Sequence, residues 1–273
     1  MIATVAALAG AGLLFLIALV ALLWWGQERI IFQPPAPPSD VHHASLRVEY
    51  TAADGQPLVA YLVGTPSTAR GLLIAFHGNA DLAIWQIPWA RELSERSGWA
   101  VLLAEYRGYG AAPGSPSCAN VRLDAEAAHA YARDALGVGG DRLAIFGHSL
   151  GSAIATELAL SHRPRILILH APFTSARDMA RFVVVRPALL AWRLISRVHY
   201  ETREAVASLD APVWVAHGGR DGVVPVSMGR AVFTTARRRG ELLIVPEAGH
   251  NDVVEAGGEH YWRWAVRALG GDQ

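Results

Sequence analysis

A serine between glycines is the residue of this chain whose surroundings best suit covalent chemistry. Residues 147–151 read Gly-His-Ser-Leu-Gly; the apolar run at 143–146 precedes them, and residues 152–160 have a helical pattern. A strand, a sharp turn and a helix in this order form the setting in which a serine hydroxyl is exposed as a nucleophile. The glycines suit this turn because the serine takes a strained backbone conformation, and flanking side chains would collide with the strand or the helix. The pattern therefore predicts that Ser149 is a nucleophile.

A serine hydroxyl needs a base, and the base needs an acid that orients it. With this type of turn, the acid and then the histidine follow later in the chain, each just past the end of a strand. Asp221 follows the apolar run at 212–217, and His250 follows the run at 241–245. We therefore expect His250 to take the proton of Ser149, and Asp221 to select the tautomer of the imidazole.

Other roles for these side chains stay open in the sequence. Asp221 precedes a glycine and would also suit an ordinary turn, in which case Asp210, before the same strand, is the alternative acid. His250 would also suit an ordinary loop position. Asn251 and Asp252 fit the cap of the last helix better than they fit the chemistry.

Two backbone N–H groups must face the negative charge that develops when a serine attacks a carbonyl group. One of them belongs to the residue after the nucleophile, here Leu150. The other belongs to the turn after an earlier strand, and the apolar run at 72–76 leads into His77, Gly78 and Asn79. We assign the second donor to the Asn79 N–H. His77 is expected to orient this loop or to be an ordinary structural histidine, and not to act as a base.

The rest of the chain alternates between strands and helices. Strands are expected near 45–50, 57–63, 71–76, 100–105, 143–146, 166–170, 212–217 and 241–245. An Asp-Gly turn signal separates the first two and predicts an antiparallel hairpin at the sheet edge. The alternation of the others with helical stretches predicts an α/β fold, a mostly parallel sheet with helices on both faces. Ser117 suits the N-cap of the helix that ends before Gly137, and Gly98 suits the end of the preceding helix.

Composition limits the classes of protein to which the chain can belong. It has 273 residues, with 24 Lys and Arg against 24 Asp and Glu, and therefore a formal net charge of zero. Because no long basic run is present, nucleic acid is not an expected partner. Cys118 is the only cysteine, which excludes an intrachain disulfide, and neither a Cys/His cluster nor a His-Glu-x-x-His pattern indicates a metal site. The expected chemistry needs no cofactor.

The N-terminal segment is apolar enough to cross a membrane. No charged side chain occurs between Ile2 and Trp25, and a helix of this length, at about 1.5 Å per residue, spans the hydrocarbon core of roughly 30 Å. Trp24 and Trp25 suit the interface between lipid and water. A cleaved signal peptide is the alternative, but the segment lacks a basic start and is longer than the usual apolar core of such peptides. We predict a single-pass membrane anchor whose orientation stays open, because Arg29 is the only nearby positive charge.

We expect an anchor at 1–26, a proline-rich linker at 27–44 and one domain at 45–273, a usual size for a single α/β domain. Within the domain, one stretch is longer than a simple crossover between strands needs. It is expected to form a short cap at about 174–210. Its apolar residues at 182–195 would line an acyl pocket, pack against the sheet or face the membrane, and these interpretations stay open.

Taken together, the motifs resemble the α/β-hydrolase superfamily. The resemblance rests, in chain order, on His-Gly-Asn at 77–79, Glu-Tyr-Arg-Gly-Tyr-Gly at 105–110, the serine motif at 147–151, Ala-Pro-Phe-Thr-Ser at 171–175, His-Gly at 217–218 with Asp221 and Val-Pro at 224–225, and Gly-His-Asn-Asp at 249–252. More narrowly, the chain is similar to the membrane-anchored branch, which includes animal ABHD-type protein thioesterases and lysophospholipases and many bacterial hydrolases. The resemblance covers nearly everything from about Phe32 to the C-terminus.

This resemblance implies a serine hydrolase that cleaves carboxylic ester or thioester bonds through an acyl-enzyme on Ser149, with a small-molecule or lipid-like substrate. An acyltransferase that uses the same residues and a non-catalytic, membrane-tethered scaffold are the alternatives. The chain departs from the usual pattern of the branch at Glu105, where Asp is common, at Ala112, where Ser is common, and at Cys118, where Glu is common. These positions leave the expected triad unchanged and bear on the loop after the strand at 100–105.

Overall fold

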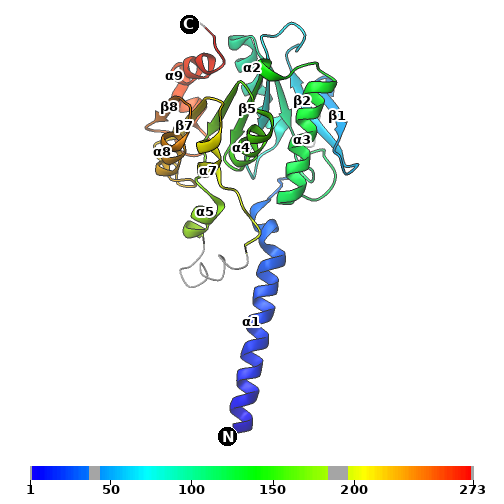
Figure 1. Cartoon of the computed structure of the whole chain (residues 1–273), viewed down its shortest axis with the longest axis vertical. Coiled ribbons are helices and arrows are strands. Elements are labelled where there is room, and N and C mark those ends of the chain that lie inside the picture. Colours follow the sequence, from blue (N-terminus) through cyan, green and yellow to red (C-terminus); the bar gives the residue numbers. More distant parts are fainter. Residues whose placement is uncertain (1, 37–43, 184–195, 272–273) are drawn as a thin grey trace.

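The computed structural model describes residues 2–36, 44–183 and 196–271. These residues form one mixed β-sheet that is covered by helices, and a long N-terminal helix extends away from this domain (Figure 1). The strands are β1 (Arg47–Thr51), β2 (Pro57–Val63), β3 (Leu72–Phe76), β4 (Ala100–Ala104), β5 (Leu143–His148), β6 (Ile166–His170), β7 (Val213–Gly218) and β8 (Arg239–Val245). The α-helices are α1 (Ile2–Ile31), α2 (Ile87–Ser97), α3 (Cys118–Asp134), α4 (Leu150–His162), α5 (Ala176–Val183), α7 (Thr202–Ser208), α8 (Val226–Thr235) and α9 (Val253–Ala268). Short 3-10 helices are η1 (Ala44–Leu46), η2 (Ala83–Gln86) and η3 (Gly140–Arg142).

The sheet confirms the predicted α/β class. Its strand order is β1-β2-β4-β3-β5-β6-β7-β8. The predicted edge hairpin is present, since β1 pairs with β2 in antiparallel fashion, and β2 is also antiparallel to β4. All further pairs are parallel. Strand β5 extends past the predicted end at residue 146, because Gly147 and His148 still pair with β6.

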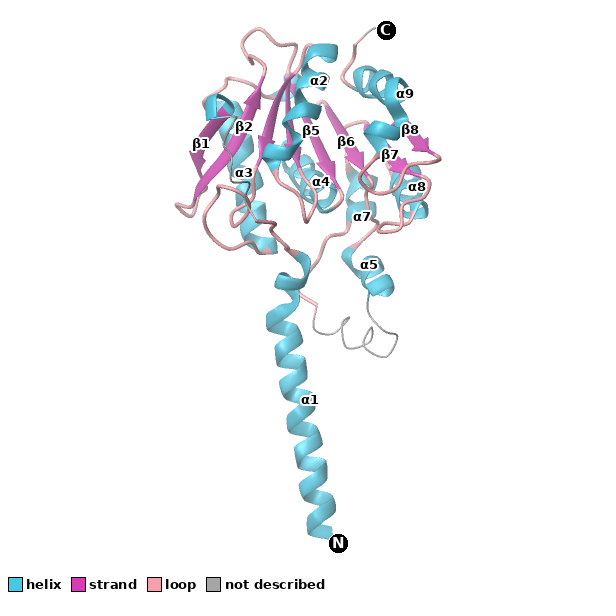
Figure 2. Cartoon of the chain, turned by 180° about the vertical axis from the view of Figure 1, so that it is seen from behind, coloured by secondary structure: helices cyan, strands magenta, loops and turns pink. Residues whose placement is uncertain are grey.

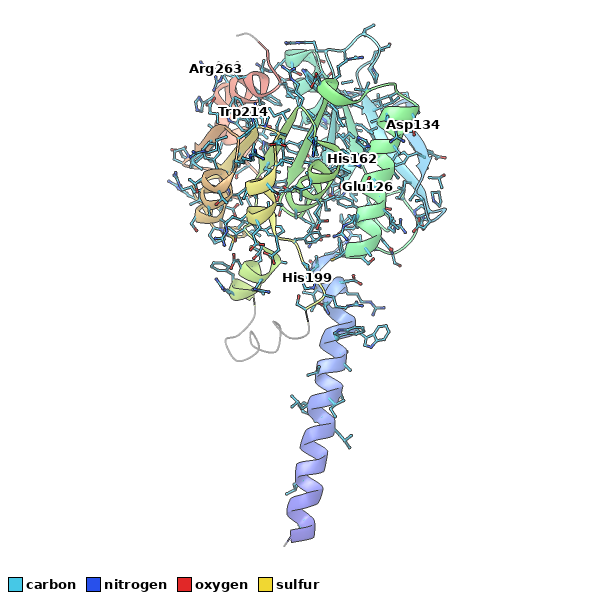
Figure 3. The ribbon with its side chains drawn as sticks, viewed as in Figure 1. Glu126, Asp134, His162, His199, Trp214 and Arg263 are labelled. Carbon is cyan, nitrogen blue, oxygen red and sulfur yellow. The ribbon has the colours of Figure 1, made fainter. Side chains whose placement is uncertain are left out.

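Helices cover both faces of the sheet, as the alternation of elements predicts. Figure 2 shows α2 and α9 on one face, and α3, α4, α7 and α8 lie on the other. Every residue of β3, β4 and β6 is buried, which explains why these strands read as continuous apolar runs. Across the second face, His162 at the end of α4 reaches Glu126 on α3, with 2.6 Å between Nε2 and Oε2 (Figure 3).

Two predicted helix ends are confirmed. The Ser117 hydroxyl caps α3, because it accepts a hydrogen bond from the Asn120 N–H at 3.1 Å. Gly98 ends α2 with a φ of 72°, a left-handed conformation that glycine adopts without steric cost.

Helix α1 does not end where the predicted anchor does. It continues past residue 26 to Ile31 because nothing in this stretch breaks a helix before Pro34. The side chain of Gln27 is fully buried, and its Oε1 accepts a hydrogen bond from the Arg197 N–H at 2.7 Å. Phe32, just after the helix, is buried in the main core. The start of the predicted linker therefore packs on the domain, while residues 37–43 lie outside the described chain.

The predicted cap at about 174–210 contains α5 and α7. Both cartoon views place α5 at the end of the domain from which α1 extends (Figures 1 and 2). Phe182 on α5 has 63% of its surface exposed. Most of the apolar stretch at 182–195 lies outside the described residues, so its role stays a prediction.

Candidate active site

Ser149 occupies the tight turn that its sequence surroundings predict. It follows β5 directly and precedes α4, with φ 52° and ψ −116°, a positive φ that is strained for a residue with a side chain. A Cβ atom on Gly147 would collide with the carbonyl group of Gly151, and one on Gly151 would collide with the carbonyl oxygen of Phe76. Close contacts between backbone atoms at this turn therefore require glycine at both positions.

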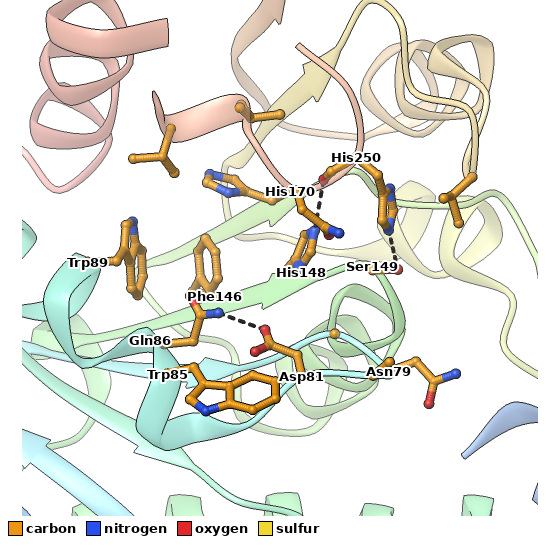
Figure 4. Close-up of a pocket in the computed structure, with 16 residues that line it drawn as sticks. Asn79, Asp81, Trp85, Gln86, Trp89, Phe146, His148, Ser149, His170 and His250 are labelled. Atoms are coloured by element: carbon orange, nitrogen blue, oxygen red, sulfur yellow. Dashed lines mark hydrogen bonds between the residues drawn. The ribbon is translucent and has the colours of Figure 1, made fainter. Parts of the chain in front are cut away.

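The structure brings Ser149, His250 and Asp221 into one chain of hydrogen bonds. His250 Nδ1 lies 2.7 Å from Asp221 Oδ2, and His250 Nε2 lies 2.9 Å from Ser149 Oγ (Figure 4). Because a carboxylate only accepts, Nδ1 carries the imidazole proton, and Nε2 is free to accept the proton of the serine hydroxyl. The alternative acid, Asp210, lies elsewhere and pairs with Arg237 at the surface, 2.9 Å apart.

Asp221 is buried but held in its charged form. Burial raises the pKa of this carboxyl, and hydrogen bonds from His217, from His250 and from the backbone outweigh burial, so that its pKa lies well below the ordinary value. The N–H groups of Val223 and Val224 both donate to Asp221 Oδ1 at 2.8 Å. His217 Nε2 lies 3.2 Å from Oδ2. The sequence places His217 in one of the motifs but does not by itself indicate this contact.

The two N–H groups expected to stabilise an oxyanion are free to act. Among the described residues, neither the Asn79 N–H nor the Leu150 N–H donates to an acceptor of the protein. Asn79 and Ser149 both line the same cavity (Figure 4). Asp252 stands at the N-cap position of α9, as expected, but its Oδ1 accepts from the Gly249 N–H at 2.6 Å rather than from the helix.

His77 supports the loop that carries Asn79 and takes no part in the chain of hydrogen bonds at Ser149. Its Nε2 lies 2.7 Å from Glu105 Oε1, and both side chains are buried. Burial lowers the pKa of His77, and the neighbouring Glu105 carboxylate raises it, with a net rise. The Tyr106 hydroxyl donates to the His77 carbonyl at 2.8 Å. Glu105, which departs from the family pattern, thus holds this loop in place, and its other oxygen accepts from the Ala83 N–H at 3.2 Å.

A cavity of about 560 Å³ lies beside Ser149. Its apolar lining includes residues that are far apart in the chain: Trp85 and Trp89 from η2 and α2, and Val253 and Val254 from α9. The described residues of the expected cap do not line it. The sequence patterns did not predict that these residues line the cavity. The only available signal was the pair of tryptophans in the helical stretch directly after the Asn79 loop.

Two histidines on neighbouring strands, His148 and His170, also line the cavity, and burial lowers the pKa of both. Burial lowers the pKa of His148 to about 4, with a further contribution from nearby His250, and His148 Nε2 lies 3.2 Å from the His250 carbonyl oxygen. Burial also lowers the pKa of His170 well below its ordinary value. Within the described ranges, no group of three or more His, Cys, Asp or Glu side chains could hold a metal ion.

Comparisons with known proteins agree with this architecture. The family model for the alpha/beta hydrolase fold matches residues 71–194. An uncharacterised protein of Mycobacterium tuberculosis is 34% identical over 247 residues, which are 87% of this chain and 86% of that protein. The human alpha/beta hydrolase domain-containing protein 17B is 29% identical over 199 residues, 73% of this chain and 67% of that protein.

Among solved structures, an esterase of Pyrococcus furiosus has a TM-score of 0.68 at 19% identity, over 88% of this chain and 97% of that chain. An esterase of Butyrivibrio proteoclasticus, solved with ferulic acid, has a TM-score of 0.65 at 21% identity, over 81% of this chain and 96% of that chain. The family model and the relatives support a hydrolase, and the solved structures show the same fold. With sequence and fold in agreement over most of its length, the chain belongs to the α/β-hydrolase superfamily.

Proposed function

We propose that the chain is a membrane-anchored serine hydrolase that cleaves carboxylic ester or thioester bonds through an acyl-enzyme on Ser149. The observation that carries the proposal is the continuous chain of hydrogen bonds from Asp221 through His250 to Ser149, beside a cavity. A serine hydroxyl is a weak nucleophile unless an adjacent base accepts its proton. Here the base and the acid that orients it are both within hydrogen-bonding distance.

The proposed reaction starts when Ser149 Oγ attacks the carbonyl carbon of the substrate and its proton passes to His250 Nε2. The N–H groups of Asn79 and Leu150 donate to the oxyanion of the tetrahedral intermediate. His250 then protonates the leaving alcohol or thiol, and the acyl group stays on Ser149. Water repeats these steps with His250 as the base, which releases the acid and restores the serine. Asp221 stays ionised throughout and stabilises the imidazolium.

A fluorophosphonate probe tests the proposal directly, because it reacts with serines that a neighbouring base activates. We expect one adduct, which peptide mass spectrometry locates at Ser149, in a preparation that also hydrolyses p-nitrophenyl butyrate. A preparation with neither adduct nor turnover is the result expected of a non-catalytic scaffold. An adduct at Ser149 together with transfer of the acyl group to an added alcohol, in preference to water, would identify an acyltransferase.

The proposed membrane anchor is supported by the surface of α1. The segment Gly10–Ile31 has a mean hydropathy of 1.8, and only 7% of its apolar window is buried against the rest of the chain. Leu14, Phe15 and Leu22 each expose about 70% of their surface, a state that is unfavourable in water and favourable in lipid. At the other end of the helix, the Arg197 guanidinium lies over the Trp24 ring, 4.3 Å from its centre.

Deletion of residues 2–26 is expected to move the protein from the membrane pellet to the soluble fraction after ultracentrifugation. Activity on a small soluble ester should persist, because all proposed catalytic groups lie at or beyond Asn79. The deletion keeps Gln27 and Glu28, which bond to the N–H groups of Arg197 and Cys118. Full-length protein extracted with detergent is the control. If expression of the full-length gene yields a protein that is soluble without detergent and begins after residue 26, the segment is a cleaved signal peptide.

The cavity walls also support a preference for apolar acyl groups. The rings of Trp89 and Phe146 lie 4.6 Å apart, and the valines of α9 are among the other lining residues. Each buried methylene contributes about 0.8 kcal/mol, so kcat/KM for p-nitrophenyl esters should rise by about two orders of magnitude from acetate to hexanoate. The series is assayed below micelle-forming concentrations. A steady fall in kcat/KM from acetate onward would exclude an acyl pocket.

A pair of tryptophan variants checks whether this cavity is the source of the preference. Trp85 lines the cavity and is half exposed, so Trp85→Ala should flatten the chain-length dependence without unfolding the domain. Trp25→Ala removes an equally large, exposed side chain on α1, away from the cavity, and should leave the dependence unchanged. Equal effects of both variants on chain-length dependence would place the acyl group elsewhere.

A further inference from the structure

The segment directly after α1 contacts the loop that carries the proposed oxyanion donor. The backbone N–H of Gln33 donates to Asn79 Oδ1 at 2.8 Å and to the Tyr109 hydroxyl at 3.1 Å. The Tyr109 hydroxyl in turn donates to Asn79 Oδ1 at 3.0 Å. Three groups from separate parts of the chain thus form a closed triangle of hydrogen bonds, and one of them belongs to Asn79, which lines the cavity and carries the proposed oxyanion donor.

These hydrogen bonds hold the Asn79 side chain. Its amide oxygen accepts from Gln33 and from Tyr109, which together use both of its lone pairs. Tyr109 is fully buried, and its ring packs 5.4 Å from the ring of His77. Tyr109 therefore holds the Asn79 amide oxygen from the core, and the Gln33 N–H holds the same oxygen from the segment after α1.

The Gln33 N–H is itself held from the side of the helix. The side chain of Phe32, its neighbour, is 4% exposed and belongs to the main core, and the Phe32 N–H donates to the Glu28 carbonyl at 2.8 Å. Glu28 Oε1 accepts from the Cys118 N–H at 3.2 Å. Pro34, the next residue, restricts the backbone of Gln33 to extended conformations. The end of α1 is therefore connected to the Asn79 loop through backbone contacts with little freedom.

We infer that the backbone N–H of Gln33 is a positioning group for the oxyanion donor, so that the segment directly after α1 helps to build the active site. The inference rests on the proposed function, in which the Asn79 N–H stabilises the tetrahedral intermediate. Such a donor must be placed within about 0.5 Å of its productive position, and loss of one donor costs about two to three orders of magnitude in kcat. A displaced donor costs less than a lost one.

The test compares Gln33→Pro with Gln33→Ala in the full-length protein in detergent. Both variants lose the side chain of Gln33, which bonds to the Ile30 carbonyl, but only the proline variant loses the backbone N–H. We expect kcat of Gln33→Pro for p-nitrophenyl butyrate to be about tenfold below that of Gln33→Ala, with KM changed by less than about threefold. Equal kcat values for the two variants would overturn the inference. So would a change in KM alone.

A double-mutant cycle checks that the effect passes through Asn79. In an Asn79→Ala background the Gln33 N–H keeps its bond to the Tyr109 hydroxyl but has no side-chain acceptor at residue 79. The difference in kcat between the proline and alanine variants at residue 33 should then vanish, because neither variant can act on residue 79 through that bond. A difference that persists at full size would show that the proline acts by another route, and would overturn the inference.

Tyr109→Phe tests the inference if the proline variant does not fold. This change removes the hydroxyl that bonds to the Gln33 N–H and to Asn79 Oδ1, and it leaves the backbone intact. A fall in kcat with KM preserved supports the positioning role, and an unchanged kcat overturns it. Ser149→Ala in the same series separates this inference from the proposed function. Full turnover of Ser149→Ala would reject the proposed function itself, whereas an inactive Ser149→Ala with equal kcat at residue 33 would reject only the positioning role.

Discussion

Replacement of Ser149 by alanine is expected to lower kcat/KM for small esters by about five orders of magnitude or more. Without Oγ no acyl-enzyme forms, and only the oxyanion donors and substrate binding continue to accelerate attack by water. The fold should stay intact, because alanine and serine carry the same strain at the φ of 52° and the change removes one hydroxyl. The measurement is the initial rate of p-nitrophenyl butyrate hydrolysis, with the thermal unfolding midpoint recorded for each variant.

Ser208→Ala is the matched control for this variant. Ser208 is an exposed serine at the end of α7, and its hydroxyl donates to the Ala205 carbonyl at 3.0 Å, so its removal should leave kcat/KM unchanged within error. If Ser149→Ala keeps wild-type turnover while its unfolding midpoint is also unchanged, Ser149 is not the nucleophile. If its midpoint drops while that of Ser208→Ala does not, the serine has a structural role that its surroundings do not explain.

Replacement of Asp221 by asparagine should cost about four orders of magnitude in kcat, as expected for a variant that presents the wrong tautomer of the histidine. The structure explains why the amide must point the wrong way. Asp221 Oδ1 accepts two backbone N–H groups at 2.8 Å, from Val223 and Val224, so the oxygen of an asparagine has to occupy that position. Its NH₂ group then faces His250 Nδ1. The imidazole must accept there and carry its proton on Nε2, where it cannot take the proton of Ser149.

Asp210→Asn is the matched control, since it makes the same chemical change before the same strand β7. Its carboxylate pairs with Arg237 at the surface, and a surface pair of this kind contributes little to stability. Turnover of this variant should equal that of the wild type. The opposite pattern, with Asp210→Asn inactive and Asp221→Asn active, would identify Asp210 as the acid.

Local sequence patterns determined the elements and the order of the proposed catalytic residues. Apolar runs of strand length, each followed by a turn, place Ser149, Asp221 and His250 at the carboxyl ends of β5, β7 and β8. In a parallel sheet these ends lie at one edge, so residues far apart in the chain come close together once the strands pair. The glycines at 147 and 151 are also a local signal, because the close backbone contacts of the turn exclude side chains there. The fold class and the chain of hydrogen bonds at Ser149 follow from such signals.

Only the tertiary structure determined which residues line the cavity and which residues hold the Asn79 loop. Trp85 and Val254 both line the one cavity because α2, which follows Trp85 closely, and α9 pack over the same face of the sheet, and no local periodicity encodes this packing. The hydrogen bond between the Gln33 N–H and Asn79 Oδ1 joins residues that are 46 positions apart. Its donor is a backbone group, which every residue except proline has, so the sequence does not predict the bond. Gln27 is likewise fully buried although it lies beyond the apolar segment, and its Oε1 accepts a hydrogen bond from the Arg197 N–H, 170 residues along the chain. Periodicity and turn chemistry depend on neighbours in the chain, whereas these contacts depend on which surfaces the packed helices present to one another.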